Sequence, residues 1–352
     1  MNGNVKKLSP IFSSTRGLAW SPDGREVVFA GSNEGCRALH AVDMEGVIRT
    51  VLGIPANLTL NDISRQGSTL LAVENERMRT RFIGPTEGDT RDLTWFDWSL
   101  LRGITADGSR ILFDETALGG GELGAVYIRG TDGSPAIRLG EGAAFSLSPD
   151  GEWALTSVGL KKGRLELVPC GAGEPRTIPS GDLEVDHASW FPDGRSICCL
   201  ASEAGRARRL YKVDLASGKR EPFSEEGITY YDTLVSPDGR YAVAHGPSRT
   251  LTIYPVDGGA PRPLRGAVPF ERMVSWSAEG DAIYVFARGE LPVKIWRMDL
   301  ETGERKLFRE LSPPDTTGVE GIANARMTPD GKALAYSYYQ RLSRMYTVEG
   351  LF

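Results

Sequence analysis

Side chains that could carry out chemistry are few in this sequence and are scattered along it. The three histidines, His40, His187 and His245, show no HxH or HExxH spacing, which a zinc site on one element would need. Loops that converge in space could still bring them together. No GxSxG phrase occurs, which excludes the nucleophile elbow of an α/β-hydrolase. We therefore expect no metal, no cofactor and no catalytic residue in this chain.

One stretch does match a nucleotide-binding pattern. Residues 119–126, GGGELGAV, fit GxGxxGxV, the phrase of a kinase glycine-rich loop. A kinase also needs a VAIK-type lysine and the HRD and DFG phrases. Here residues 127–129 are Tyr, Ile and Arg, and neither phrase occurs. We interpret the stretch as a long connection between two strands.

The four cysteines, Cys36, Cys170, Cys198 and Cys199, show no CxxC spacing. Cys198 and Cys199 are adjacent in an apolar run, so in a strand their side chains would face opposite ways. We expect buried free thiols that act as small hydrophobic side chains.

The charge and hydropathy of the chain limit the classes of partner that we expect it to bind. Its 352 residues carry a formal net charge of −5 at pH 7 and a pI near 5.5, whereas nucleic-acid-binding domains are usually basic. No run approaches eighteen apolar residues, and no charged-then-apolar leader opens the chain. We expect a monomer that binds no nucleic acid and that neither inserts into a membrane nor carries a secretion signal. Met1 fits either a native start or an added start codon.

The elements that would position any site are marked by a repeated phrase. SPDGR at residues 21–25 returns as SPDGE, FPDGR, SPDGR and TPDGK, with weaker copies SRQG, TADG and SAEG. Successive copies are 41 to 51 residues apart, about 44 on average, which is the length of a four-stranded propeller blade. The marker glycines are Gly24, Gly67, Gly108, Gly151, Gly194, Gly239, Gly280 and Gly331.

The phrase is typical of a tight hairpin turn. Ser, Pro and Asp suit the first three positions of a type I turn, and the glycine adopts the left-handed conformation that closes a three-residue hairpin. In all eight copies an apolar residue stands four positions before the glycine, and another stands three positions after it. Neighbouring runs such as EVVFAG, RILFDE and SICCLA are short and rich in branched residues, which favours buried strands over helices.

Each marked hairpin is followed by two further strand-like runs with a turn between them, as in LYKVDLASGKREPF. We therefore predict an all-β fold, a single domain over residues 1–352 that forms an eight-bladed β-propeller of four-stranded blades. Seven blades is the alternative if the second or third repeat is too degenerate. The eighth repeat lacks a fourth strand, and GNVKKLSP near the N-terminus resembles fourth-strand segments. We expect this N-terminal strand to pair in the last blade and close the ring.

In such a ring, the segments that lead into each first strand would surround one mouth of the central channel. About seven or eight residues before the marker glycines they carry polar side chains, with aromatic residues nearby. Such a mouth could bind a protein, a peptide or a small polar ligand. The alternative is that these groups only solvate a water-filled channel. The candidate ligand-binding residues are Arg16, Asp186, His187, Asp232, Arg272, Asn324, Trp98 and Tyr231.

The repeated W-SPDG-R/K phrase, followed by three apolar residues, resembles the TolB-type, WD-like β-propeller repeat, and it lacks the GH and WD pairs of true WD repeats. More narrowly, DGGAPRPL at residues 257–264 and YTVEGL at residues 346–351 resemble the C-terminal propellers of bacterial eukaryotic-like serine/threonine kinases. That resemblance implies a kinase domain, often with a membrane span, ahead of a propeller that senses or binds something. No functional residue transfers, because the repeat phrase is structural.

These observations favour a non-catalytic binding propeller, the sensor or protein-interaction region of a bacterial serine/threonine kinase. One alternative is a TolB-like stand-alone propeller that docks proteins or peptides. Another is a propeller associated with an enzyme, either the gating domain of a prolyl-oligopeptidase-type peptidase or a stand-alone lyase or dehydrogenase. As part of a membrane-anchored kinase the chain would lie on the extracytoplasmic side, whereas a native start at Met1 would favour the cytoplasm.

Overall fold

The structure is a computed structural model that describes residues 5–33, 35–116, 119–159, 164–179, 181–229, 232–289 and 291–352. In these ranges every regular element is a β-strand, which confirms the all-β prediction. None of these residues forms a helix long and apolar enough to cross a membrane. Contacts within the chain divide it into two compact units, Met78–Tyr339 and Met1–Arg77 with Gln340–Phe352. That residues 1–352 form a single domain stays a prediction.

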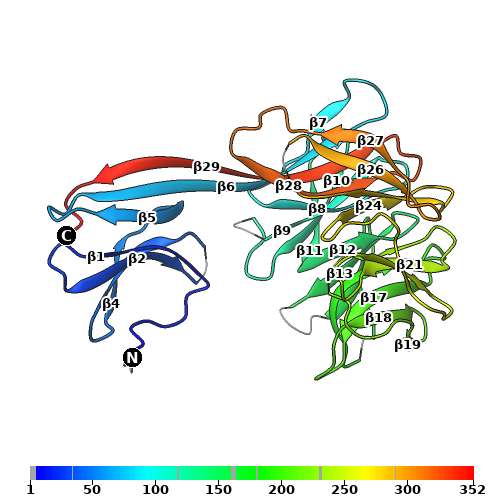
Figure 1. Cartoon of the computed structure of the whole chain (residues 1–352), viewed down its shortest axis with the longest axis horizontal. Helices are drawn as coiled ribbons and strands as arrows, with labels where there is room; N and C mark the ends of the chain where they lie inside the picture. The colour runs from blue at the N-terminus through cyan, green and yellow to red at the C-terminus, as the bar shows by residue number, and fades with distance from the viewer. Residues whose placement is uncertain are drawn as a thin grey trace. The chain divides into compact units, whose positions relative to one another are not determined.

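The larger unit, Met78–Tyr339, is a β-propeller. Five of its blades are four-stranded antiparallel sheets whose strands are neighbours in chain order (Figure 1). The first blade consists of β8 (Ser99–Ile104), β9 (Arg110–Glu115), β10 (Ala125–Gly130) and β11 (Ile137–Glu141). The second consists of β12 (Ala143–Leu147), β13 (Trp153–Val158), β14 (Arg164–Pro169) and β15 (Arg176–Thr177). The third consists of β16 (Glu184–Trp190), β17 (Ser196–Ser202), β18 (Arg209–Asp214) and β19 (Arg220–Pro222). The next two are β20 (Leu234–Val235), β21 (Tyr241–His245), β22 (Leu251–Pro255) and β23 (Arg262–Pro263); and β24 (Arg272–Trp276), β25 (Ala282–Phe286), β26 (Val293–Asp299) and β27 (Arg305–Leu311).

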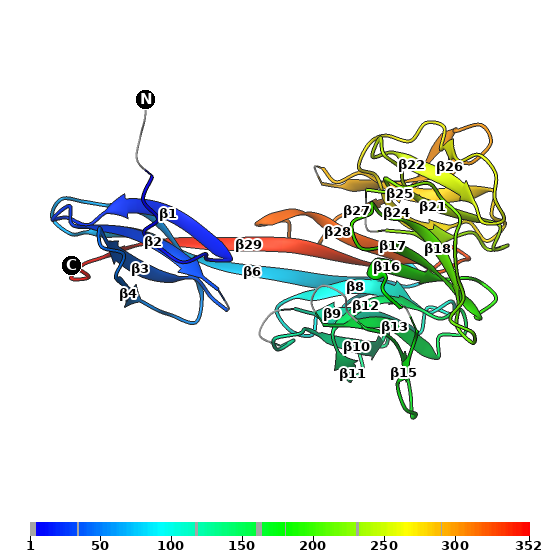
Figure 2. The ribbon, with the colours of Figure 1, turned by 90° about the horizontal axis from the view of Figure 1, so that it is seen from below.

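The sixth blade, the closing blade, is built from two distant parts of the chain. β28 (Val319–Met327) pairs with β29 (Leu334–Val348), β29 pairs with β6 (Thr69–Ile83), and β6 pairs with β7 (Thr90–Asp92). Figure 2 shows β6 and β29 side by side. The first strands β8, β12, β16, β20, β24 and β28 contact one another in that order, and β28 also contacts β8. In the part of the chain that the structure describes, six blades therefore close the ring.

The smaller unit contains the remaining strands. β1 (Ser14–Trp20), β2 (Glu26–Ser32), β3 (Ala38–Asp43) and β4 (Ile48–Leu52) form a four-stranded sheet in chain order. β5 (Asn57–Ile63) pairs with the first part of β6 and packs against β1, so that Leu58, Leu60 and Leu71 join the core of the first sheet.

Neither eight blades nor the alternative of seven is confirmed, because the second and eighth repeats each lack the turn expected between their second and third strands. Two strands were expected in each place, but β6 has no Gly, Pro or Asp across its fifteen residues, and β29 has no Gly, Pro, Asp or Asn. These residues favour tight turns, and in their absence each segment continues as one long strand. The predicted closure by an N-terminal strand is also corrected. Residues 5–13 form no strand, and β29 takes β6 as its neighbour instead.

The core of the propeller lies between adjacent blades. Leu155 and Leu165 of the β12–β15 blade pack with Ile197 and Cys199 of the next blade, and all four side chains are fully buried. Burial of each such aliphatic side chain stabilises the fold by roughly 1.5–3 kcal/mol. The alternating apolar runs of the sequence thus face neighbouring blades rather than a single central core.

The predicted turns are confirmed at all eight marker glycines. Each glycine has φ between +64° and +91°, and each donates its N–H to the carbonyl three residues earlier at 2.9–3.1 Å. In five turns the Ser or Thr hydroxyl also donates to the Asp carboxylate two residues later, as from Ser21 to Asp23 at 2.6 Å. The hydroxyl and carboxylate bind backbone N–H groups in turn, which explains why these residue types recur in the phrase.

Gly194 offers a test of the turn with no steric complication. Its φ is +64°, and a Cβ added there would meet no atom within 4 Å. Gly194→Ala should therefore lower the free energy of unfolding by on the order of 1 kcal/mol through backbone strain alone, and Gly194→Val by 1–2 kcal/mol. Urea unfolding of both variants measures this. Unchanged stability in both would contradict the left-handed turn.

A buried relay of hydroxyl groups joins the closing blade to its neighbour. Ser337 Oγ on β29 lies 2.8 Å from Thr80 Oγ1 on β6 and accepts the Leu101 N–H of β8 at 2.8 Å. Thr80 Oγ1 donates to the carbonyl oxygen of Ser99 at 2.7 Å. Both hydroxyl-bearing residues are fully buried. The relay thus links three strands from distant parts of the sequence where the ring closes.

Ser337→Ala should destabilise the ring by about 1–3 kcal/mol, because the Leu101 N–H would stay buried without an acceptor. Ser343→Ala is the matched control, since Ser343 lies on the same strand and is exposed. Chemical unfolding of both variants provides the comparison. Equal stability of the two would show that the relay does not contribute to closure.

Candidate functional site

The first strands of the blades surround the axis of the ring, and several of them carry a β-bulge. In β8 the extra residue is Arg102, between Leu101 and Gly103, and in β16 it is Asp186, between Val185 and His187. A bulge leaves one residue outside the regular pairing and turns its side chain away from the alternation of the strand. Polar side chains can therefore occupy positions that strict alternation would give to apolar ones.

Charged and polar side chains from five blades meet near this axis. We call this group the axial cluster. Its members are Arg102 on β8, His187 on β16, Asp232 just before β20, Arg272 on β24, and Asn324 and Arg326 on β28.

Asp232 is the acidic centre of the axial cluster. Its Oδ2 lies 2.8 Å from Arg272 Nη1, and its Oδ1 lies 3.9 Å from Arg326 Nη2. Burial by itself raises the pKa of Asp232, but Arg272 and Arg326 outweigh it and hold the pKa at about 2. Asp232 is therefore ionised at neutral pH.

Arg326 binds the backbone of two neighbouring blades. Its Nε donates to the carbonyl oxygen of Arg102 at 3.2 Å, and its Nη1 donates to that of Met273 at 3.1 Å. Nη1 also donates to the side-chain oxygen of Asn324 at 2.7 Å, and the Asn324 amide donates to the Leu101 carbonyl at 2.8 Å. One guanidinium thus fixes the relative positions of β8, β24 and β28.

Arg102 completes the basic part of the cluster. Its Nε donates to Oδ2 of Asp114 on β9 at 2.9 Å, and the Asp114 carboxylate is fully buried. The Arg102 side chain is 28% exposed, more than those of Arg272 and Arg326, at 15% and 12%. Arg102 is therefore the most accessible of the three arginines.

His187 is a neutral member of the cluster. It is buried, and its Nδ1 lies 3.0 Å from the hydroxyl oxygen of Thr233. Burial lowers the pKa of His187 to about 4, and the positive charges of Arg326, Arg102 and Arg272 act in the same direction against the opposing charge of Asp232. The imidazole adds hydrogen-bonding capacity at pH 7 but no charge.

Four of the eight predicted site residues therefore lie in the axial cluster, namely His187, Asp232, Arg272 and Asn324. Asp186 instead forms an ion pair with Arg208. Trp98 donates its backbone N–H to Glu115 at 3.0 Å and packs against the ring of Tyr339. Arg16 lies exposed on β1 of the smaller unit. Tyr231 lies outside the described residues.

Arg102, Asp114 and Arg326 were missed by the sequence analysis. The predicted polar residues stand seven or eight positions before their marker glycines, whereas Arg326 stands five and Arg102 six residues before theirs. Most blades have Gly, Ser or Leu at the position of Arg326. A charged residue there was the signal that could have identified it.

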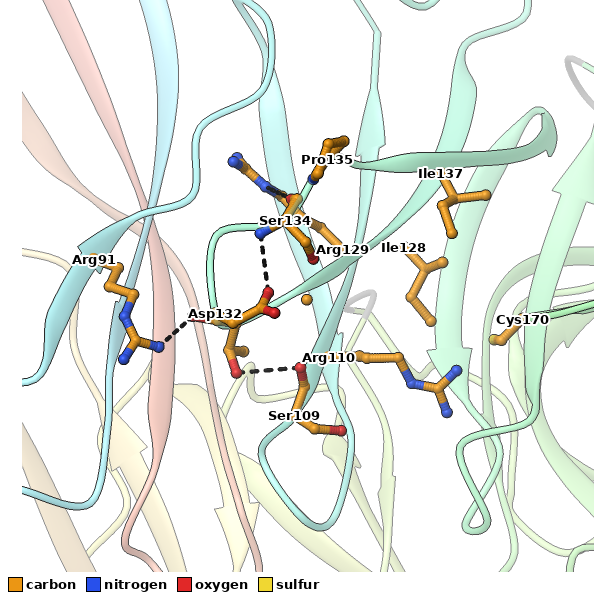
Figure 3. A pocket seen from close by; sticks show the side chains of 12 residues that line it. Arg91, Ser109, Arg110, Ile128, Arg129, Asp132, Ser134, Pro135, Ile137 and Cys170 are labelled. Atoms are coloured by element: carbon orange, nitrogen blue, oxygen red, sulfur yellow. Dashed lines mark hydrogen bonds between the residues drawn. The ribbon is translucent and has the colours of Figure 1, made fainter.

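Two grooves lie away from the axial cluster, near the turns of the β8–β11 blade. Figure 3 shows the first, of ≈ 440 Å³. Its arginines are already bound: Arg91 donates to the Thr131 carbonyl at 2.6 Å, and Arg129 donates to the carbonyls of Thr94, Gly133 and Ser134. The second, of ≈ 490 Å³, is lined by turn residues that include Asp107 and Asp330. We interpret the arginines of the first groove as supports for these turns.

The remaining candidate groups are the metal ligands, the cysteines and the glycine-rich stretch. No group of three potential metal ligands occurs among the described residues. The cysteines are free thiols, and burial raises the pKa of Cys170 to about 11 and that of Cys198 to about 12. Residues 119–124 of the glycine-rich stretch belong to the connection between β9 and β10, as expected, and the stretch then continues into β10.

Comparison with known proteins supports the fold. A structure assigned as TolB from Agrobacterium tumefaciens is 18% identical, with a TM-score of 0.55, and the match covers 76% of this chain and 99% of that one. TolB from Acinetobacter baumannii is 13% identical over 95% of this chain and 66% of that one, with a TM-score of 0.47. A manganese complex of oligogalacturonate lyase is 16% identical over 79% and 77%, also with a TM-score of 0.47. No protein-family model matches the sequence, and no similar curated protein was found.

The chain thus has a β-propeller fold similar to that of TolB. At 18% identity the likeness concerns the fold alone.

The buried histidine predicts a pH dependence of stability. The pKa of His187 is about 4 in the folded chain and 6.5 in its ordinary state, so between these values the unfolded chain binds the proton more readily. Above pH 6.5 His187 makes its full contribution to the free energy of unfolding. This free energy falls by on the order of 2–3 kcal/mol as the pH drops to about 4. In the His187→Asn variant this acid-induced loss of stability should disappear, while the side chain at position 187 can still form a hydrogen bond with Thr233. Urea unfolding at pH 7.5, 5.5 and 4.5 tests this, and parallel pH profiles would contradict it.

Proposed function

We propose that this chain is a non-catalytic binding propeller that docks a peptide, a protein segment or a small polar ligand at the axial cluster. The observation that carries the proposal is the convergence of three guanidiniums and Asp232 on the ring axis. A polar group in a protein interior is costly unless it is paired, and here some guanidinium donors are left over. Arg102, at 28% exposed, can reach a ligand without rearrangement of the ring.

A second support is the rigidity of the site. The three arginines stand on first strands, and Arg326 is fixed by three hydrogen bonds from its Nη1 alone. Binding groups that are held in place lose little conformational entropy when a ligand arrives. The cluster is therefore better suited to recognition of a defined ligand than a set of mobile surface lysines would be.

The finer part of the proposal is that this propeller serves as the sensor or interaction region of a bacterial serine/threonine kinase. Its support is the repeat phrase together with residues 257–264 and 346–351. The stand-alone TolB-like docking propeller is the alternative to this assignment. A gating propeller of a prolyl-oligopeptidase-type peptidase gains no specific support from the axial cluster.

A thermal-shift panel of peptides, peptidoglycan fragments, sugars and nucleotides tests the binding function. A ligand present at a hundred times its Kd should stabilise the chain by about 2.7 kcal/mol, which is measurable as a higher Tm. Arg272→Ala should abolish the shift, because it removes a charged partner from the cluster. Arg138→Ala is the control, since Arg138 lies exposed on β11.

The panel separates three results. A shift that is lost in Arg272→Ala and kept in Arg138→Ala supports docking at the axial cluster. A shift kept in both variants would place the ligand elsewhere and overturn the proposed site. Absence of any shift across the panel would count against a binding function of this kind.

A further inference from the structure

The axial cluster carries more positive than negative charge in a place largely withdrawn from water. Its three guanidiniums, Arg102, Arg272 and Arg326, face two carboxylates, Asp114 and Asp232. His187 adds no charge at pH 7. Burial raises the pKa of Asp114, so the surplus is at least one positive charge. At side chains that are 12–28% exposed such a surplus is costly in the absence of an anion.

The guanidinium N–H donors that are not used within the axial cluster can be identified. Arg102 uses only its Nε, toward Asp114, and its Nη1 and Nη2 have no partner in the part of the chain that the structure describes. Arg326 Nη2 has Asp232 Oδ1 at 3.9 Å, beyond hydrogen-bonding distance. The two side chains belong to neighbouring strands, because Arg326 Nε binds the carbonyl of Arg102 itself.

Unused guanidinium donors on two adjacent arginines are suited to a planar anion with two oxygen atoms. A carboxylate matches the paired N–H groups of a guanidinium in a bidentate arrangement. We propose that the axial cluster recognises a carboxylate group, at the C-terminus or on an acidic side chain of a docked peptide.

This inference rests on the proposed function, and it names the chemical class of the ligand. It assigns different roles to the two arginines and to Asp232. Arg102 and Arg326 would bind the carboxylate, whereas Asp232 would compete with it for the same guanidiniums. Removal of the Asp232 charge should therefore strengthen binding, while removal of the Arg102 charge should weaken it.

The experiment uses the full chain and two matched probes, N-acetyl-triglycine and its C-terminal amide, which differ only in the carboxylate. Arginine Nε–H resonances in a TROSY spectrum report the titration, and inorganic phosphate serves as a third probe. The free acid should give saturable shifts that the amide does not give. Arg102→Gln should weaken binding of the acid by on the order of tenfold or more, and Asp232→Asn should strengthen it, while Arg138→Gln should leave it unchanged.

The outcomes decide between the possibilities. Equal responses to acid and amide, or acid binding unchanged by Arg102→Gln, would overturn the carboxylate inference. If Arg102→Gln does not fold, Asp232→Asn decides, because a purely structural cluster would give no tighter binding. Stronger binding of phosphate than of the acid would also overturn the inference.

Two further results separate this inference from the proposed function. Amide binding that Arg272→Ala abolishes would refute recognition of a carboxylate and leave the proposed docking function intact. Absence of binding by all three probes would refute the inference alone.

Discussion

The pairing of β29 with β6 is the constraint on which the rest of the propeller depends. Each of the other five blades is one continuous segment of chain, but the closing blade takes β28 and β29 from one part and β6 and β7 from another. This arrangement brings β28 next to β8, so the six first strands enclose an axis. The axial cluster exists only because of this closure, since Arg102 stands on β8 and Arg326 on β28.

The residues that hold the ring together are also those that we propose bind a ligand. Arg326 binds the backbone carbonyls of Arg102 and Met273, which replaces water for those groups and fixes three first strands. Its remaining nitrogen, Nη2, lies 3.9 Å from Asp232 Oδ1, beyond hydrogen-bonding distance. A charge network of this kind stabilises the fold less than an apolar core of equal size would, because desolvation offsets much of the attraction.

The sequence predicted local features well, since the chemistry of a turn is contained in a few residues. Eight hairpins with left-handed glycines were placed correctly, because Ser or Thr, Asp and Gly each have a specific task in the turn. The blade number was not predictable from the repeat count. It depends on two segments that lack Gly, Pro and Asp, and on contacts such as Thr80 with Ser337, which are 257 residues apart.

The axial cluster could be predicted in part for a related reason. Counting back from the marker glycine located Asp232, Arg272, His187 and Asn324, which occupy regular positions. Bulges shift this count by one residue, so Asp186 in β16 faces Arg208 rather than the axis, and Arg102 in β8 went unnoticed. Where a bulge falls depends on the pairing of two strands, and one strand alone does not reveal it.

The closing blade also has a consequence for how the chain is made. During synthesis β6 and β7 leave the ribosome early, whereas β28 and β29 follow more than two hundred residues later. Until then β6 has no partner on the side that β29 will occupy, and an unpaired edge of fifteen residues is open to pairing with other chains. Translation speed and chaperone binding during this interval should therefore influence the yield of folded protein more than they would in a propeller whose blades form strictly in order.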